Sequence, residues 1–152
     1  MSKKLTYKGN IADGLQDKLN LSTLKGKVGY KINKFQICGS IMGQTDDELT
    51  CQVFTKSQAG AITNIVDFTD PDLLAVAFYN DSATSNYGND SQVIFDGEVF
   101  NQDIFITAVD SSGNSGATNY YIELETVALS DLQSTQITLK SLRTIASRWA
   151  LS

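Results

Sequence analysis

The sequence contains no histidine, a single proline and only two cysteines among its 152 residues. Without histidine, the Ser-His-Asp and Cys-His nucleophilic arrangements, His-ligated metals and the commonest general acid–base group are excluded. The two cysteines, Cys38 and Cys51, are too few for a four-ligand zinc site. Glycine-rich phosphate-binding patterns of the GxGxxG and GxxxxGK[ST] kinds are absent as well. The sequence therefore predicts that the protein is not an enzyme and has no catalytic residue, cofactor or metal site.

Long apolar runs are also missing. None approaches the roughly 18 residues of a membrane-spanning helix. The first twenty residues lack the apolar stretch of a secretory signal peptide. We therefore expect no membrane association, and reduced thiols at Cys38 and Cys51, because disulfides are rare outside exported proteins. Hydrophobic residues make up 41% and charged residues 19% of the chain, which is typical of a folded domain.

Positive charge is nearly absent from the middle of the chain and is concentrated at its ends. Residues 1–34 contain eight lysines against two aspartates, and residues 35–139 contain Lys56 alone against fifteen acidic residues. Residues 140–152 add three basic residues. An acidic body disfavours nucleic acid, whose phosphates require clustered basic side chains. We expect residues 1–25 to form a basic N-terminal arm that docks on an acidic surface of another copy, a solvated tail being the alternative.

Alternation of apolar and polar residues predicts β-strands through the middle of the chain. The strand patterns run over residues 28–37, 49–53, 61–68, 73–78, 92–95, 103–109 and 118–127. Near Asn33 the apolar parity changes, which predicts a β-bulge. The SSGNSG segment over residues 111–116 is the strongest turn signal. These patterns indicate an all-β fold, a jelly-roll-like β-sandwich over residues 26–128.

Residues 129–152 change to helical periodicity. Ser130 and Asp131 are typical of a helix start. The helical spacing is carried by Leu132, Leu139, Leu142 and Trp149, and Arg143 is one of the basic residues near the end. We expect a short C-terminal helix whose apolar stripe packs either on its own sheet or against a partner. The arm, the sandwich and this helix form one globular domain.

Carboxylates supply candidate sites of two kinds. Acidic residues form three groups: Asp67, Asp70 and Asp72; Asp46, Asp47 and Glu48; and Asp81 with Asp90. Such groups suit calcium, but none has the EF-hand spacing, and aspartate is also common in turns. Glu123 and Glu125 share one strand face, as a glycosidase's carboxylates do, but such a pair is normally a solvated face.

The C-terminal third resembles a known class of proteins. The segment NYYIELE over residues 119–125, followed by Leu129-Ser130 and by TLKSLR over residues 138–143, resembles the C-terminal part of small virion structural proteins of marine tailed phages. The FNQDIFIT segment over residues 100–107 fits the same pattern, so that the resemblance covers about residues 98–146. It implies an all-β capsid decoration (cement) protein, made in the host cytoplasm, located in the virion and assembled as an oligomer. No functional residue is carried by the motif itself.

The chemistry of the residues agrees with that class. We expect a non-enzymatic capsid decoration protein that stabilises the shell through contacts with the major capsid protein or other virion proteins and with its own copies. The expected contact residues are Lys3, Lys4, Lys8, Leu132, Leu139, Leu142, Arg143 and Trp149. The alternative is a carbohydrate- or receptor-binding β-sandwich module of a phage fibre or spike. Its sugar-stacking candidates are Tyr79, Tyr87, Tyr120 and Tyr121, which are equally suited to core packing.

Overall fold

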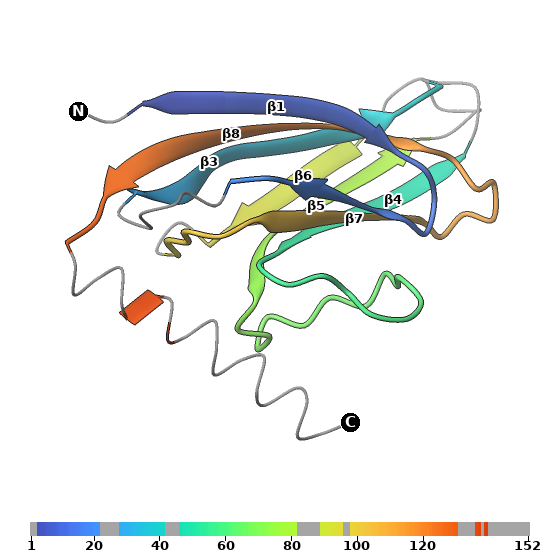
Figure 1. The fold of residues 1–152 in the computed structure, drawn as a ribbon. Coiled ribbons are helices and arrows are strands. Elements are labelled where there is room, and N and C mark those ends of the chain that lie inside the picture. The colour runs from blue at the N-terminus through green and yellow to red at the C-terminus, as the bar shows by residue number, and fades with distance from the viewer. Residues whose placement is uncertain are drawn as a thin grey trace.

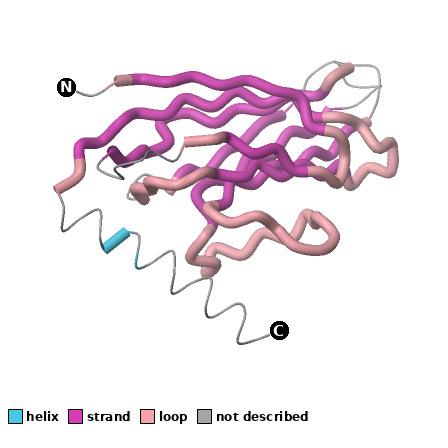
Figure 2. Tube along the Cα trace, in the orientation of Figure 1, coloured by secondary structure: helices cyan, strands magenta, loops and turns pink. Residues whose placement is uncertain are grey.

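The described part of the protein forms two antiparallel sheets. The computed structural model describes residues 3–21, 28–41, 46–81, 89–95 and 98–130, together with residues 136, 137 and 139. In these ranges the chain forms eight strands (Figure 1, Figure 2). The strand orders are β1-β8-β3 in one sheet and β2-β7-β4-β5-β6 in the other. The predicted all-β class is confirmed and the layers are consistent with the predicted β-sandwich, whereas the jelly-roll likeness stays a prediction.

The sheets enclose a single apolar core. Sheet A consists of β1 (Lys4–Ile11), β8 (Thr118–Ala128) and β3 (Val28–Gly39). Sheet B consists of β2 (Gln16–Leu19), β7 (Ile104–Asp110), β4 (Asp47–Phe54), β5 (Leu73–Asp81) and β6 (Asn89–Ile94). Both sheets contribute large apolar side chains that are at most 1% exposed, among them Phe35, Ile122 and Leu124 from sheet A, and Leu49, Val53, Ile104 and Ile106 from sheet B. Their burial is the main contribution to the stability of the sandwich.

The alternation predicted for β3 and β8 is confirmed. In β8 the even-numbered residues from Tyr120 to Leu124 are buried in the core. In β3 the register shifts between Ile32, opposite Leu124, and Lys34, opposite Glu123. The extra residue, Asn33, forms the predicted bulge. Because the bulge changes the parity of the strand, apolar residues on both sides of it point into the core.

The predicted strand over residues 61–68 is wrong. Residues 55–72 form a loop without regular secondary structure, whose two ends meet through a hydrogen bond from Thr55 N–H to Asp72 O at 2.9 Å. Side chains inside the loop bind neighbouring backbone groups instead of a strand partner. Asp67 Oδ1 accepts a hydrogen bond from Thr69 N–H at 2.9 Å, for example. Such local bonds compete with a sheet ladder.

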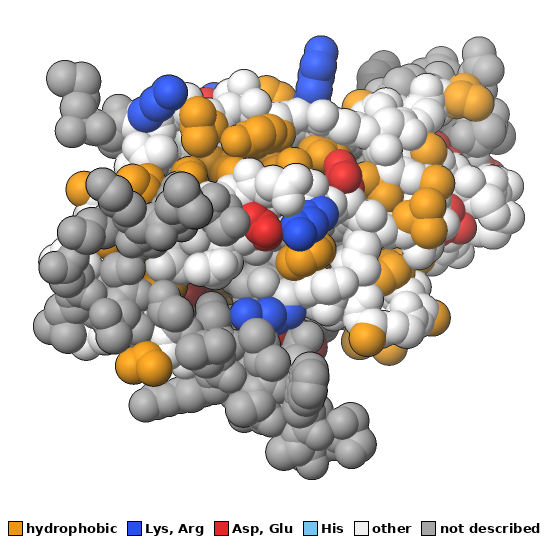
Figure 3. Space-filling view, in the orientation of Figure 1, with side chains coloured by type: hydrophobic (Ala, Val, Ile, Leu, Met, Phe, Trp, Pro, Cys, Tyr) orange, Lys and Arg blue, Asp and Glu red, His pale blue; other side chains and the backbone are white. Residues whose placement is uncertain are grey.

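The described part of the predicted N-terminal arm, residues 3–21, belongs to the two sheets instead. β1 pairs with β8 over all eight of its residues, and β2 pairs with β7. The sequence KLTYKGNI already alternates in period two, but its lysines and Gly9 conceal that pattern. Gly9 is required because a Cβ there would lie 2.7 Å from Tyr120 Oη. β1 and β2 are the edge strands on one flank, where Figure 3 shows hydrophobic side chains at the surface.

Little of the predicted C-terminal helix lies within the described residues. Residues 136, 137 and 139 are helical, as expected. Residues Leu132, Leu142, Arg143 and Trp149 lie outside the described part of the chain. Among the described residues, no helix has the length and apolar character needed to cross a membrane.

Deleting residues 1–20 is expected to destabilise the whole sandwich. The deletion removes β1 and β2, and with them Ile11 and Leu19, which are 3% and 9% exposed. Burial of these two side chains alone contributes about 3–6 kcal/mol, a large share of a domain's stability. Urea unfolding followed by circular dichroism measures the loss. As a control, Lys3→Ala with Lys4→Ala changes the free energy of unfolding by less than about 0.5 kcal/mol. An unchanged unfolding midpoint after the deletion would show that the segment is a solvated arm.

Candidate functional site

The outer face of sheet A carries opposite charges on neighbouring strands. Glu125 of the central strand β8 lies between Lys4 of β1 and Lys31 of β3 in the register of the sheet. Glu123, one row further along, lies opposite Lys34 of β3. Opposite charges on adjacent strands stabilise a sheet. The basic N-terminal stretch therefore faces carboxylates of its own chain.

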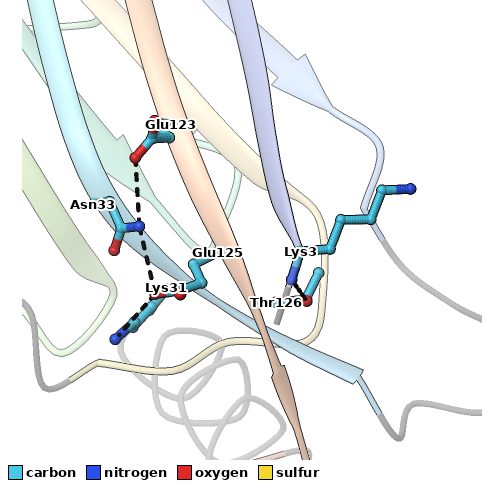
Figure 4. Close-up of polar contacts among 6 residues, drawn as sticks. All are labelled: Lys3, Lys31, Asn33, Glu123, Glu125 and Thr126. Carbon is cyan, nitrogen blue, oxygen red and sulfur yellow. Dashed lines mark hydrogen bonds and ion pairs between the residues drawn. The ribbon is translucent and has the colours of Figure 1, made fainter. Parts of the chain in front are cut away.

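Asn33 and Lys31 hold the two glutamates in place (Figure 4). Asn33 Nδ2 donates to Glu123 Oε2 at 3.4 Å and to Glu125 Oε2 at 3.5 Å. Lys31 Nζ lies 3.3 Å from Glu125 Oε2. Both carboxylates are thus engaged in cross-strand contacts, as on the solvated face of a sheet. This arrangement does not resemble a glycosidase site, in which one carboxyl must protonate the substrate.

A groove of about 530 Å³ crosses the same outer face. Its lining consists of Lys8, Gly9, Gln36, Ile37, Cys38, Asp90, Asn119, Tyr120 and Tyr121. Lys8 of β1, Tyr121 of β8 and Gln36 of β3 form one row across the sheet. Asn119 and Cys38 form the next row, and Asp90 comes from β6 of the other sheet. The groove therefore lies on backbone whose positions are fixed by the ladder of sheet A.

Of the four tyrosines considered for stacking, Tyr121 is the one that the structure places at this surface. Its side chain is 37% exposed, whereas Tyr79 and Tyr120 are buried in the core. Burial, together with Asp81, raises the pKa of Tyr79 to about 12, and its hydroxyl lies 3.2 Å from Asp81 Oδ2. Both buried tyrosines therefore serve packing. Tyr87 lies outside the described residues.

The loop over residues 55–72 covers part of the outer face of sheet B (Figure 1). Gln16 of β2 binds it in both directions: Gln16 Nε2 donates to Gln58 O at 3.1 Å, and Gln58 N–H donates to Gln16 Oε1 at 3.1 Å. Gln52 of β4 donates from Nε2 to Ile65 O at 3.1 Å. The space beneath the loop is a cavity of about 220 Å³ lined in part by Gln52 and Thr107. These bonds attach the loop firmly to the sheet.

The same side of the molecule exposes large apolar side chains. Ile65 and Phe68 of the loop are 74% and 57% exposed, and Phe78 of β5 and Val93 of β6 are 39% and 37% exposed. Phe68 packs edge-on against Phe95, which follows β6, with ring centroids 5.1 Å apart. We call Ile65, Phe68, Phe78 and Val93 the apolar platform. Large exposed apolar side chains gathered on one side of a protein are a feature of interaction surfaces.

The aspartates considered for calcium act as turn residues where the structure describes their bonds. Asp67 Oδ1 accepts hydrogen bonds from Thr69 N–H and Oγ1–H, and Asp70 Oδ1 accepts one from Asp72 N–H. These bonds hold the pKa of Asp67 below its ordinary value. Over the described residues, no group of three or more His, Cys, Asp or Glu side chains is arranged to hold a metal ion.

Asp110 organises the predicted turn between β7 and β8. Its carboxylate accepts hydrogen bonds from Glu48 N–H at 3.2 Å, from Ser112 N–H at 3.0 Å, from Ser112 Oγ–H at 2.6 Å and from Gly116 N–H at 2.7 Å. Burial alone would raise the pKa of Asp110, but these donors outweigh it and hold the pKa below its ordinary value. Gly113, with φ of 92°, lets the chain reverse inside the turn. The turn prediction for residues 111–116 is thus confirmed.

Substituting Asp110→Asn is expected to lower stability in a pH-dependent way. Because the folded-state pKa is depressed, the ionised carboxylate stabilises the protein above its ordinary pKa of about 4, and this contribution is lost as the pH falls through the folded value. Loss of the charged acceptor costs about 1.5–3 kcal/mol at pH 7. Urea unfolding at neutral pH and at pH 3 measures the difference, which shrinks in acid. Ser112→Ala, the control, costs less because three of the four bonds remain. An equal loss at both pH values would contradict the role of the charge.

The two cysteines lie in different sheets and are free thiols. Cys51 of β4 is fully buried, and burial raises its pKa to about 12, so that it is an inert core residue. Cys38 of β3 is half-buried at the groove.

The structure describes four of the eight contact residues expected from the sequence: Lys3, Lys4, Lys8 and Leu139. Lys4 and Lys8 of β1 are exposed, as is Lys3 just before it, whose N–H is bonded to Thr126 Oγ1 at 2.8 Å (Figure 4). Leu139 is 44% exposed. The sequence did not indicate the apolar platform, because its four residues fall inside the segments 61–68, 73–78 and 92–95, which the alternation predicts to be strands. The available signal was the cluster of turn-forming residues Asp67, Asp70 and Pro71 at and just after the end of the first of these segments.

The sequence matches no model of a known protein family and none of the functionally characterised proteins with which it was compared.

Proposed function

We propose that the protein is a non-enzymatic capsid decoration protein of a virion, which self-associates through the apolar platform and stabilises the shell by contacts with the major capsid protein. The resemblance of residues 98–146 to small virion proteins of tailed phages supplies the class. The platform of Ile65, Phe68, Phe78 and Val93 is the observation that carries the mode of action.

The attachment of the loop favours a binding role for the platform. Long loops without secondary structure are uncommon in compact domains and usually serve function. Here Gln16 and Gln52 bind the loop to sheet B through side-chain amides. Ile65 and Phe68 are therefore presented on a fixed support, which lowers the entropy lost when a partner binds. Decoration of a shell needs many such modest contacts acting together.

Replacing Ile65→Ser together with Phe68→Ser is expected to weaken self-association without unfolding the protein. Both side chains are mostly exposed, so the free energy of unfolding changes by about 1 kcal/mol or less. Loss of their burial at the interface weakens association by at least tenfold, which corresponds to about 1.4 kcal/mol. Sedimentation equilibrium measures the association constant.

Leu15→Ser is the matched control, because Leu15 is 57% exposed but precedes the edge strand β2, at the opposite edge of sheet B from Phe78 and Val93 on β5 and β6. It is expected to leave association unchanged. Wild-type association in the double variant, or weakening of equal size in the control, would contradict the assignment of the platform.

A further inference from the structure

We propose that the groove on the outer face of sheet A binds an uncharged saccharide, which stacks on Tyr121. The volume of about 530 Å³ lies inside the range of roughly 300–1,000 Å³ that is usual for ligand sites. Most of the lining of the groove belongs to sheet A, whereas the apolar platform belongs to sheet B; strand β6 contributes Asp90 to the groove and Val93 to the platform. The existence of the groove does not depend on the proposed role in decoration.

The groove is built on rigid backbone. Tyr121 lies in the central strand, and its neighbours in the row, Lys8 and Gln36, are fixed by the register of β1 and β3. Behind this row, Asn119 Oδ1 accepts a hydrogen bond from Asn10 Nδ2 at 2.8 Å. Asn119 Nδ2 in turn donates to Gly39 O at 3.3 Å. A site whose supports are already hydrogen-bonded loses little entropy on binding.

The side chains of the groove combine an aromatic ring with both donors and acceptors. Tyr121 offers a partly exposed ring with a hydroxyl at its end. The Lys8 ammonium donates hydrogen bonds, the Asp90 carboxylate accepts them, and the Gln36 amide can both donate and accept. One positive and one negative group make this set electrically neutral.

This combination selects the chemistry of the occupant. A phosphate or other anion would be opposed by Asp90, and a cation would be opposed by Lys8. An uncharged sugar ring has one apolar C–H face for Tyr121 and hydroxyl groups at its edge, which can donate to Asp90 and accept from Lys8. The open form of the groove along the sheet suits a linear oligosaccharide rather than an enclosed small molecule.

The test is a titration of isotope-labelled full-length protein with maltohexaose, cellohexaose and chitohexaose, and with inorganic phosphate. The backbone amide resonances of Lys8, Gln36 and Tyr121 report on the groove, and calorimetry gives the affinity. We expect at least one of the oligosaccharides to shift these resonances. Tyr121→Ala weakens its binding by at least about tenfold, the effect of truncating a central aromatic contact.

Two variants distinguish stacking from other effects. Tyr121→Phe retains the ring and stays within about twofold of wild type. Phe78→Ala removes an equally exposed aromatic from sheet B and leaves sugar binding unchanged while it weakens self-association. The proposal is overturned if none of the three oligosaccharides shifts the groove resonances, if phosphate alone does, or if Tyr121→Ala binds as wild type does.

Discussion

The hydrogen bond from Tyr120 Oη to Asp17 Oδ2, 2.6 Å long, joins the two sheets, and the arrangement of the N-terminal strands depends on it. Burial and Asp17 both raise the pKa of Tyr120, so that its hydroxyl remains a donor. Gly9 leaves room for the Tyr120 ring against β1. Gly14, with φ of 80°, then carries the chain from sheet A to sheet B, where its N–H donates to Ala108 O at 2.8 Å. Residues 3–21 thereby complete both sheets.

This placement changes the meaning of the uneven charge. In the sequence, basic ends on an acidic body indicate docking between copies. In the fold, Lys4, Lys31 and Lys34 lie opposite Glu123 and Glu125 of their own sheet. Because these lysines already face carboxylates of their own chain, they are less available to attract another copy. Contact between apolar surfaces is therefore the better candidate for the assembly of copies. The two proposed sites then lie mainly on opposite sheets of one sandwich, which would let the protein bind a partner on one side and a saccharide on the other.

The sequence predicted those elements whose residues alternate strictly. β8 and the bulge at Asn33 followed from parity alone, because a buried face specifies its register. The prediction of a strand over residues 61–68 was wrong, since the side chains of Thr63 and Asp67 accept hydrogen bonds from nearby backbone N–H groups. The pattern of apolar residues does not reveal such bonds. β1 was not predicted because Gly9 interrupts its apolar face. That position must be glycine to leave room for the ring of Tyr120, which is 111 residues away in the sequence. Both proposed sites combine distant segments, so the sequence offered Tyr121 as one of four tyrosines but not the groove.

Light scattering of the purified protein in dilute buffer and in about 1 M salt tests the central claim, assembly through apolar contact, most directly. At about 1 M the screening length is near 3 Å, so contacts between exposed charges are largely removed. The apolar platform predicts an oligomer whose mass is unchanged or larger in high salt, because burial of apolar surface is not screened. A monomer at both salt concentrations, or an oligomer that dissociates in high salt, would contradict that claim.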